Sequence, residues 1–313
     1  MYKEKLIDNL TKLKNMHSEI AELIKNDSVS YIDIPLHYNI GDQLIYLGTE
    51  QFIRDFDINV IHRAFFSNIN NKKIEESDTI LFHGGGNIGD LYPRHQKLRE
   101  KLILKYKNKK IVILPQSIHF ESIENKIKCE KIFSSHPNLH IFVRDKKSFE
   151  IANSFSKNVK LMPDMAHSLH PLIYTKEVTD LNYIKKILNL RRRDKETLNS
   201  VPSLYKKEFD WDDMIGINDI LILKLFSLLQ LTPFLKSKIN NYWLKNSSNL
   251  CFRAEQYFSS FDEVHTDRLH GFILSLLLGK KIVIYDNAYG KNSNYFDAWI
   301  EENELLRKEI SSK

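Results

Sequence analysis

The chain has 313 residues, and its 42% hydrophobic and 11% aromatic content, with only 10 glycines and 8 prolines, excludes a disordered or fibrous protein. This length favours two domains with a cleft between them. The formal net charge of +6 attracts anions, but the basic runs are short and do not alternate with aromatic residues, so we do not expect a nucleic-acid-binding protein. The two cysteines lie far apart, which excludes a disulfide framework or zinc-ligand pair and favours a reducing compartment.

Residues 6–23 predict an amphipathic helix near the N-terminus, because apolar residues recur there at helical spacing. The segment has neither the apolar core nor the cleavage site of a signal peptide. We therefore expect a cytoplasmic protein, with the inner face of the membrane as the alternative location.

Short apolar runs then alternate with helical patterns, which is typical of an α/β fold with a parallel sheet covered by helices on both faces. The predicted strands of the first half are residues 30–34, 59–61, 79–82, 111–114, 140–143 and 159–162. A second, shorter series contains residues 187–190, 263–265 and 282–285. We place the boundary between His170 and Asp180, which gives an N-terminal domain over residues 1–175 and a C-terminal domain over residues 176–313.

Polar segments follow the predicted strands of the first half at residues 37–42, 83–90, 115–119 and 144–145. Ligands of parallel sheets bind at the carboxyl ends of the strands, so we expect these four loops to converge on one rim. Asp42 opens a predicted helix whose N-terminus favours anions, and an equal alternative is that it caps this helix.

The glycine-rich segment 84–89 is the strongest local signal, because backbone without side chains lets a ligand approach closely. Its glycines match the dinucleotide spacing G-x-G-x-x-G. We do not predict a dinucleotide site, since the segment follows the third strand and the next strand lacks the acidic residue that a ribose needs. A tight turn would explain Gly84 and Gly85, whereas Asn87 and Asp90 indicate binding.

Arginines and a histidine follow two predicted strands of the second half. Residues 191–193 are three arginines, and Arg268 and His270 lie two residues apart. Arginine grips carboxylate and phosphate in a bidentate manner, and histidine transfers protons near neutral pH. An isolated Arg or His is more often a surface charge, but this pair at a strand-to-helix turn indicates an active site. A polar segment at 286–291 adds to the same rim.

Residues 219–245 are rich in Leu and Ile but too interrupted to span a bilayer. We predict a pair of helices that pack on the core. The alternative is a surface that contacts the membrane, because lysines flank apolar residues there. The residues concerned are Lys236, Lys238, Lys245, Phe234, Leu235 and Trp243.

Seven segments resemble, in order and spacing, the polysaccharide pyruvyl transferase family, and together they cover nearly the whole chain. These are residues 41–42, 84–92, 114–117, 143–145, 163–166, 266–271 and 286–291. The resemblance implies two Rossmann-like domains in a GT-B-like arrangement with the active site in the inter-domain cleft. It also implies a transferase of exopolysaccharide or capsule biosynthesis. Such an enzyme moves pyruvate from phosphoenolpyruvate onto two hydroxyls of a sugar, in a polysaccharide or its lipid-linked precursor, and releases phosphate as a pyruvate ketal forms.

The resemblance assigns catalysis to Arg268 and His270 and, with the register open among three arginines, to Arg192. We expect no cofactor beyond phosphoenolpyruvate as donor substrate, and no metal ion. The substrate-binding residues that we expect are Asp42, Gly85, Gly86, Asn87, Asp90, Gln116, Ser117, Arg144, Asp267, Leu269, Asn287 and Lys291.

We expect the second domain to hold the donor and the first-domain loop 84–92 to orient the sugar. His270 would transfer protons, and Arg268 and Arg192 would hold the donor's anionic groups. Two alternatives remain: a GT-B-type glycosyltransferase that uses a nucleotide sugar, and a catalytically silent glycan-binding or scaffold protein. A binding module needs no proton-transfer residue beside an anion clamp, which argues against the latter.

Overall fold

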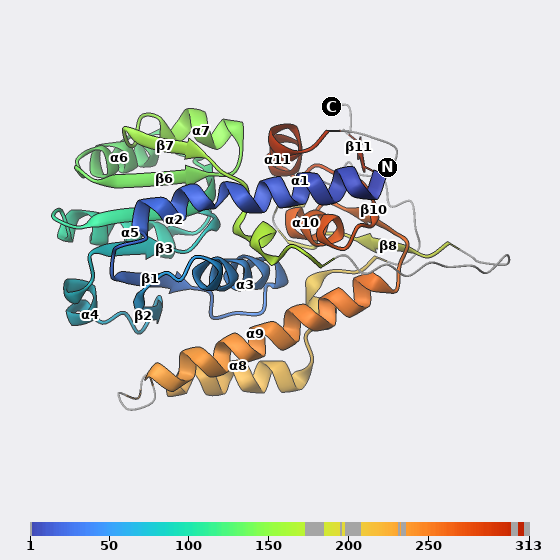
Figure 1. Cartoon of the computed structure of the whole chain (residues 1–313), viewed down its shortest axis with the longest axis horizontal. Helices are drawn as coiled ribbons and strands as arrows, with labels where there is room; N and C mark the ends of the chain where they lie inside the picture. Colours follow the sequence, from blue (N-terminus) through green and yellow to red (C-terminus); the bar gives the residue numbers. More distant parts are fainter. Residues whose placement is uncertain are drawn as a thin grey trace.

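The computed structural model describes residues 2–172, 185–194, 196–197, 208–230, 232, 236–301 and 306–309. Two parallel β-sheets organise these residues (Figure 1). The first has seven strands in the order β2-β1-β3-β5-β6-β7, with β4 paired to β5, and the second has four strands in the order β11-β10-β9-β8. The prediction of an α/β fold built on a parallel sheet is thus confirmed.

The first half of the chain builds the larger sheet. Its strands are β1 (Val29–Ile34), β2 (Val60–Phe65), β3 (Thr79–Phe82), β4 (Gly85–Gly89), β5 (Lys110–His119), β6 (Leu139–Val143) and β7 (Asn158–Leu161). Its helices are α1 (Tyr2–Met16), α2 (Ser18–Ile24), α3 (Ile40–Asp55), α4 (Asn71–Glu76), α5 (Pro93–Lys105), α6 (Ile123–Ser134) and α7 (Lys146–Ala152). A 3-10 helix, η1 (Met165–Leu169), follows β7.

The second half builds the smaller sheet. Its strands are β8 (Ile187–Leu190), β9 (Glu263–Thr266), β10 (Lys281–Tyr285) and β11 (Leu306–Glu309). Its helices are η2 (Trp211–Met214), α8 (Ile217–Leu229), α9 (Lys236–Ser259), α10 (Leu269–Leu277) and α11 (Lys291–Trp299). The predicted boundary at residue 175 lies outside the described residues.

The sequence pattern missed strand β4. Glycines are poor strand formers, so the segment 84–89 reads as a loop, although residues 85–89 pair with β5. This pairing exists because β5 continues through residues 115–119, which we expected to form a loop. Gly89 allows the close approach: its φ is 115°, and a Cβ there would lie 1.7 Å from the His119 carbonyl oxygen. The glycines therefore allow an extra strand, β4, to pair closely with β5.

One hydrophobic core joins the two halves. A single cluster of buried residues includes side chains of both sheets, together with α1, α3, α9 and α10. Helix α3 of the first half contacts η1, α9 and α10. Gly48 permits its contact with η1, because a Cβ there would lie 2.1 Å from the Met165 carbonyl oxygen. The two sheets are therefore held together by close packing around α3.

Helices α8 and α9 form the predicted helical pair, and they lie side by side along one edge of the molecule (Figure 1). Trp243 of α9 is fully buried, and its indole N–H donates to the Pro35 carbonyl oxygen at 2.8 Å. The predicted packing on the core thus holds for Trp243, and the alternative of a membrane contact is wrong for this residue. Phe234 and Leu235 lie outside the described residues. No helix of the described segments is both long and apolar enough to cross a membrane.

Candidate active site

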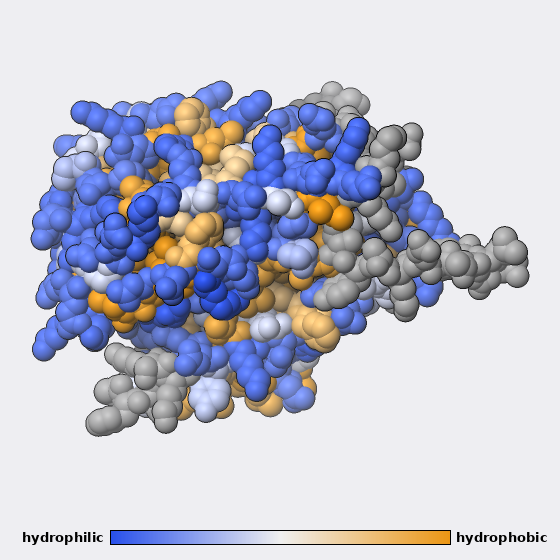
Figure 2. All heavy atoms as spheres, viewed as in Figure 1, coloured by the Kyte–Doolittle hydropathy of each residue, from blue (hydrophilic) through white to orange (hydrophobic). Residues whose placement is uncertain are grey.

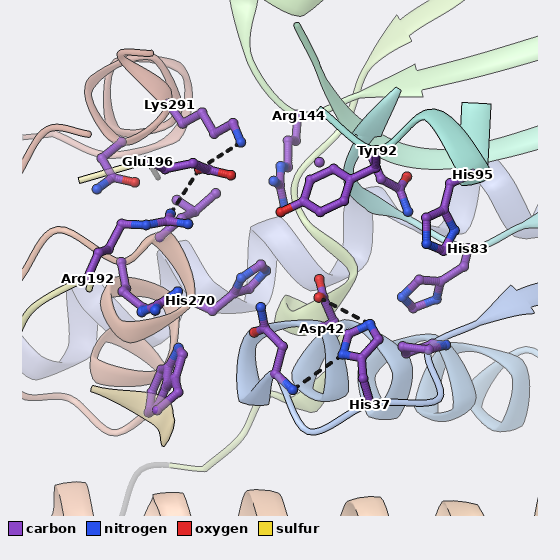
Figure 3. A pocket seen from close by; sticks show the side chains of 18 of the residues that line it. His37, Asp42, His83, Tyr92, His95, Arg144, Arg192, Glu196, His270 and Lys291 are labelled. Carbon is purple, nitrogen blue, oxygen red and sulfur yellow. Dashed lines mark hydrogen bonds and ion pairs between the residues drawn. The ribbon is translucent and has the colours of Figure 1, made fainter. Parts of the chain in front are cut away.

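A pocket opens where the two halves meet, and its lining comes from both sheets (Figure 3). In Figure 3, Lys291, Glu196 and Arg192 lie on one side, and Tyr92, His95 and His83 lie on the other. The lining residues of the first half are Asp33, Pro35, His37, Asn39, Asp42, His83, Gly86, Asn87, Tyr92, His95 and Arg144. Those of the second half are Arg192, Glu196, Trp211, Arg268, Leu269, His270, Lys291 and Asn292.

His270 lies in the first turn of α10 and is held from the opposite half of the chain. Its Nε2 is 3.4 Å from Oδ2 of Asp164, which lies between β7 and η1. Its other ring nitrogen faces the start of α3, where a Cβ on Gly41 would come within 2.5 Å of Nδ1. Only glycine leaves room for the ring at this position, so the placement of His270 requires that residue 41 has no side chain.

Asp164 is fully buried and joins His270 to Arg144. Its Oδ2 accepts a 2.5 Å hydrogen bond from Nη1 of Arg144, and its Oδ1 accepts one from the backbone N–H of Ala166. Burial alone would raise the pKa of Asp164, but His270 and Arg144 together lower it well below its usual range. The carboxylate is therefore a fixed negative charge that orients both of its neighbours.

Arg144 and Lys291 bring positive charge to one point from the two halves. A Cβ on Gly86 would lie 3.0 Å from Nη2 of Arg144 and 3.6 Å from Nζ of Lys291. Lys291 also pairs with Glu196 at 3.0 Å. Burial lowers the pKa of Lys291 even though Glu196 favours its charged form. The bare backbone at Gly86 thus lines the pocket between two cations, an arrangement that favours an anionic group there.

Arg192 is the one of the three consecutive arginines that lines the pocket. Its guanidinium makes a two-pronged contact with Asp194, with both distances 2.9 Å, and its Nη1 lies 3.0 Å from Oε2 of Glu196. Burial would raise the pKa of Glu196, but Lys291 and Arg192 lower it below its ordinary value. Arg191 turns instead toward the Tyr285 ring. Of the three arginines, Arg192 is therefore the one whose position agrees with the expected site.

The Arg268 guanidinium makes a two-pronged contact with a carboxylate of the protein itself. Its Nε and Nη2 donate to the two oxygens of the buried Asp210 at 2.5 and 2.6 Å, and its Nη1 lies 3.3 Å from Asp194. We expected this guanidinium to bind an anionic group of the substrate. In this structure it fixes the guanidinium at the start of α10, beside Trp211, which also lines the pocket.

Nine of the expected site residues line this pocket. They are Asp42, Gly86, Asn87, Arg144, Arg192, Arg268, Leu269, His270 and Lys291. Asp42 lies in the first turn of α3, where it is 3.7 Å from Nε2 of His37, while the cap of this helix is the neighbouring Asn39. The cap role that we considered for Asp42 thus belongs to Asn39.

Six expected residues are outside the lining, and five of them support it. Gln116 accepts from the Asn87 backbone N–H and donates to the His83 carbonyl oxygen. Ser117 accepts from Nε of Arg144. Asp267 accepts from the Arg192 backbone N–H, and Asn287 accepts from the Lys291 backbone N–H. Gly85, with a positive φ of 123°, lies beside Asp42, whose Oδ1 would be 3.8 Å from a Cβ on Gly85.

Asp90 lies away from the pocket lining. Its Oδ2 accepts the backbone N–H groups of Glu121 and Ser122, both at 2.8 Å, and its Oδ1 accepts the side-chain amide of Asn125. These contacts hold the start of α6. The acceptor-orienting role that we expected of Asp90 has no support from this placement, because both of its oxygens face the helix terminus.

Sequence reasoning missed several lining residues, among them Asp33, His83, Tyr92, His95 and Glu196. His83 directly follows β3, and Glu196 lies in the arginine-containing segment, so both carried a positional signal. His95 and Asp33 carried no such positional signal, since His95 lies inside a helix and Asp33 lies inside a strand. Among the described residues no group of three or more His, Cys, Asp or Glu is arranged to hold a metal ion.

Comparisons with known proteins agree on one family. Residues 39–289 match the family described as "Polysaccharide pyruvyl transferase". The chain is 37% identical to "Putative pyruvyl transferase EpsO" of Bacillus subtilis (strain 168) over 304 residues, which cover 94% of this chain and 92% of that protein. It is 28% identical over 298 residues to "Pyruvyl transferase 1" of Schizosaccharomyces pombe, covering 87% of this chain and 69% of that protein.

A solved structure shares the fold. It is the crystal structure of the uncharacterised protein KP1_0663 from Klebsiella pneumoniae, with a TM-score of 0.60 at 21% identity, covering 96% of this chain and 99% of that one. The family match spans most of the chain and includes pocket residues of both halves, from Asn39 to His270. The chain therefore belongs to the polysaccharide pyruvyl transferase family.

Proposed function

We propose that this protein transfers pyruvate from phosphoenolpyruvate onto two hydroxyls of one sugar, in a polysaccharide or its lipid-linked precursor. The observation that carries the proposal is the space at Gly86, flanked by Arg144 and Lys291 and joined through Asp164 to His270. An anion clamp and a proton-transfer group thus share one carboxylate. A donor that carries both a carboxylate and a phosphate, and that must be protonated on carbon, fits this combination.

The donor would occupy the space between the two halves, with one anionic group at Gly86 and the other toward Arg192. Each of these cations already has a carboxylate partner, as Lys291 and Arg192 have in Glu196. The cations are therefore held in place before the donor arrives, and little side-chain entropy remains to be lost on binding. Cations from both halves take part, so the donor contacts both domains and not only the second.

The reaction requires two proton movements that balance. A proton is added to the methylene carbon of phosphoenolpyruvate, which becomes the methyl group, while a first sugar oxygen bonds to the central carbon. The bond between the central carbon and the phosphate ester oxygen then breaks, and phosphate leaves with the electron pair. The second sugar oxygen then bonds to the same carbon. Of the two hydroxyl protons, one replaces the proton given to the methyl group and the other leaves with phosphate. His270, paired with Asp164, is the proposed acid in the first step.

We further propose that the two sheets represent two domains in a GT-B-like arrangement, residues 1–175 and 176–313, with the acceptor entering beside the first. No cofactor or metal ion takes part in this scheme. Phosphoenolpyruvate is an intracellular metabolite, so the reaction would occur in the cytoplasm or at the inner face of the membrane.

The exposed face of helix α8 supports the proposal that the protein meets a lipid-linked acceptor at a membrane surface. Its exposed side chains are Asn218, Lys224 and five aliphatic residues: Ile217, Ile220, Leu221, Leu225 and Leu228. Its acidic residue, Asp219, is buried against Arg253. Apolar atoms are visible along the lower edge of Figure 2, where α8 lies. An apolar face with a lysine and no exposed carboxylate suits an anionic lipid surface better than a second copy of itself, since interface cores exclude lysine.

Vesicle flotation tests this surface. Leu225→Glu should reduce binding to vesicles that contain phosphatidylglycerol and leave the oligomeric state unchanged. Equal binding by Leu225→Glu and wild type would remove α8 from the membrane contact. Dimers that Leu225→Glu dissociates would assign the face to a second copy instead.

Phosphate release from phosphoenolpyruvate tests the central proposal. The assay uses a panel of hexoses and N-acetylhexosamines, free, as 4-nitrophenyl glycosides and lipid-linked, and mass spectrometry follows addition of the pyruvate ketal. Gly86→Ala should weaken phosphoenolpyruvate binding because a methyl group would fill the space between Arg144 and Lys291. The same panel with nucleotide sugars tests the glycosyltransferase alternative. Nucleotide release without phosphate release from phosphoenolpyruvate would establish that alternative.

A further inference from the structure

A second histidine–aspartate pair lines the pocket, away from the donor's anions. Nδ1 of His95, in the first turn of α5, is 2.8 Å from Oδ1 of Asp33. The Asp33 side chain is fully buried, whereas 27% of the His95 side chain is exposed, and both residues line the pocket. A carboxylate at Nδ1 holds the ring in the tautomer whose Nε2 can accept a proton.

The backbone at Asp33 is distorted where the pair forms. Asp33 has a positive φ of 65°, which is rare for a residue other than glycine, and the register of β1 against β2 shifts between Ile32 and Ile34. Such a bulge turns a side chain toward a new direction, and strained residues of this kind cluster at functional sites. The bulge places a carboxylate at the carboxyl end of β1, behind the ring of His95.

Arg99 fixes the same carboxylate from the other side. Its fully buried guanidinium pairs with Oδ2 of Asp33 at 3.2 Å, and its Nη2 also donates to Oδ1 of Asn87 at 2.7 Å. Asn87 lines the pocket. Asp33 therefore has an ionic partner at each carboxylate oxygen, and Arg99 connects the His95 pair to the β4 segment.

His83 lies on the same wall. It is 3% exposed, its Nδ1 is 2.7 Å from the hydroxyl of the buried Tyr31, and among the described residues its Nε2 has no hydrogen-bond partner. Burial lowers the pKa of His83 to about 4, so this ring is neutral at neutral pH. A buried polar atom that faces a pocket and lacks a partner is costly unless a ligand satisfies it. A hydroxyl of the acceptor sugar would supply that partner, since His83 lines the pocket.

We propose that His95, oriented by Asp33, is the base that removes the proton from the attacking sugar hydroxyl, while His83 binds a hydroxyl of the same sugar. This assignment rests on the proposed pyruvyl transfer. The hydroxyl oxygen forms its bond to the central carbon of phosphoenolpyruvate as its proton moves to Nε2 of His95. The electrons of the carbon–carbon double bond take a proton from His270, and the proton on His95 returns to His270 through solvent before the next turnover.

The alternative is that Asp33 and His95 form a structural link between β1 and α5. Arg99 already makes that connection, since it lies in α5 and pairs with Asp33 while fully buried. A second link would not require a ring that is partly exposed in the pocket. The functional assignment accounts for both the exposure of His95 and the strained backbone of Asp33.

Three variants test the assignment: His95→Gln, Asp33→Asn and the distant control His140→Gln. Asparagine tolerates a positive φ, so Asp33→Asn keeps the backbone and removes the charge. The sugar is the panel glycoside that gives the fastest phosphate release with wild type. His95→Gln should lower kcat by about 10²- to 10⁴-fold, the range of general base catalysis, with phosphoenolpyruvate affinity within twofold of wild type by calorimetry. His140→Gln, which lies on β6, should behave as wild type.

The double variant separates positioning from a structural role. If Asp33 acts through His95, Asp33→Asn should lower kcat on its own but add little to His95→Gln, because the two residues act as one unit. If the kcat losses of the two single variants multiply in the double variant, the assignment is overturned. A kcat of His95→Gln within threefold of that of an active wild type would overturn it as well. Loss of phosphoenolpyruvate binding with unchanged kcat would also overturn it, by placing His95 at the donor. Should His95→Gln unfold, His95→Asn repeats the test. A wild type that releases no phosphate refutes the pyruvyl transfer itself.

Discussion

Two groups of the same composition lie at different parts of the pocket, and each contributes a histidine to its lining. We call them the Asp33 group (Asp33, His95, Arg99) and the Asp164 group (Asp164, His270, Arg144). In each, a buried aspartate from the carboxyl end of a first-sheet strand contacts one histidine and one arginine. The Asp33 group comes entirely from the first half of the chain, whereas His270 reaches the Asp164 group from the second half.

This difference has a physical consequence. The Asp33 group depends on β1 and α5, which belong to one sheet and its covering helix. The Asp164 group exists only while α10 packs against α3 and η1, because these contacts bring His270 to Asp164. The packing of the two halves therefore controls one group and not the other. Variants that disturb this packing should separate them.

The largest expected effect is that of His270→Ala. The change removes the proposed proton donor at the rim of the pocket, so kcat should fall by about 10³-fold or more while the fold is retained. Stopped assays of phosphate release, with thermal unfolding as the control for folding, measure this. Turnover within a few-fold of wild type in a folded variant would exclude His270 from the mechanism.

Gly41→Ala should act on the Asp164 group alone. The new methyl group would overlap the His270 side chain and displace its ring from Asp164, so we expect a loss of about 10²-fold in kcat, as for a misplaced catalytic group, with a smaller loss of stability than a clash with backbone causes. Its matched control on the same helix is Gly48→Ala, whose methyl group meets backbone of η1 and cannot be relieved by a rotation. That variant should instead lose about 1–3 kcal/mol of stability or more. Equal kinetic losses in both variants would refute the distinction.

Arg268→Lys should have a moderate effect. A lysine cannot reproduce the two-pronged contact with Asp210, so the start of α10 loses its anchor. We expect phosphoenolpyruvate affinity to fall by about 10- to 100-fold, the equivalent of one or two charged hydrogen bonds. Calorimetric titration with phosphoenolpyruvate measures the change. If lysine binds the donor as well as arginine does, the contact of residue 268 with Asp210 does not control the donor site.

The smallest effect is expected for Asp90→Asn, which touches neither group. Its carboxylate holds the start of α6, so the variant should lose about 0.5–2 kcal/mol of stability, as for a weakened helix cap, and keep donor and acceptor kinetics near those of wild type. Chemical denaturation together with the phosphate assay checks this. A selective rise in the KM for the sugar would restore the acceptor role that we first expected of Asp90.

The residue pattern predicted most of the first sheet and several residues of the pocket. Strand β3 and strand β8 match the predicted ranges 79–82 and 187–190, because continuous apolar runs are characteristic of strands buried on both faces. His270 and Lys291 could be selected because polar residues after parallel strands meet at one rim. The pattern failed at β4, where glycines hide a strand, and at Asp90, where a polar residue in the right segment serves a neighbouring helix.

The sequence by itself determined the α/β architecture and the family, since both follow from local periodicity and from the order of short motifs along the chain. Only the tertiary structure decided which arginine of residues 191–193 enters the pocket, and that Arg268 is held by Asp210. It also decided the pairing of Asp33 with His95 and of Asp164 with His270, across 62 and 106 residues. Contacts of this kind depend on how packed elements meet in space, and spacing along the chain carries no record of them.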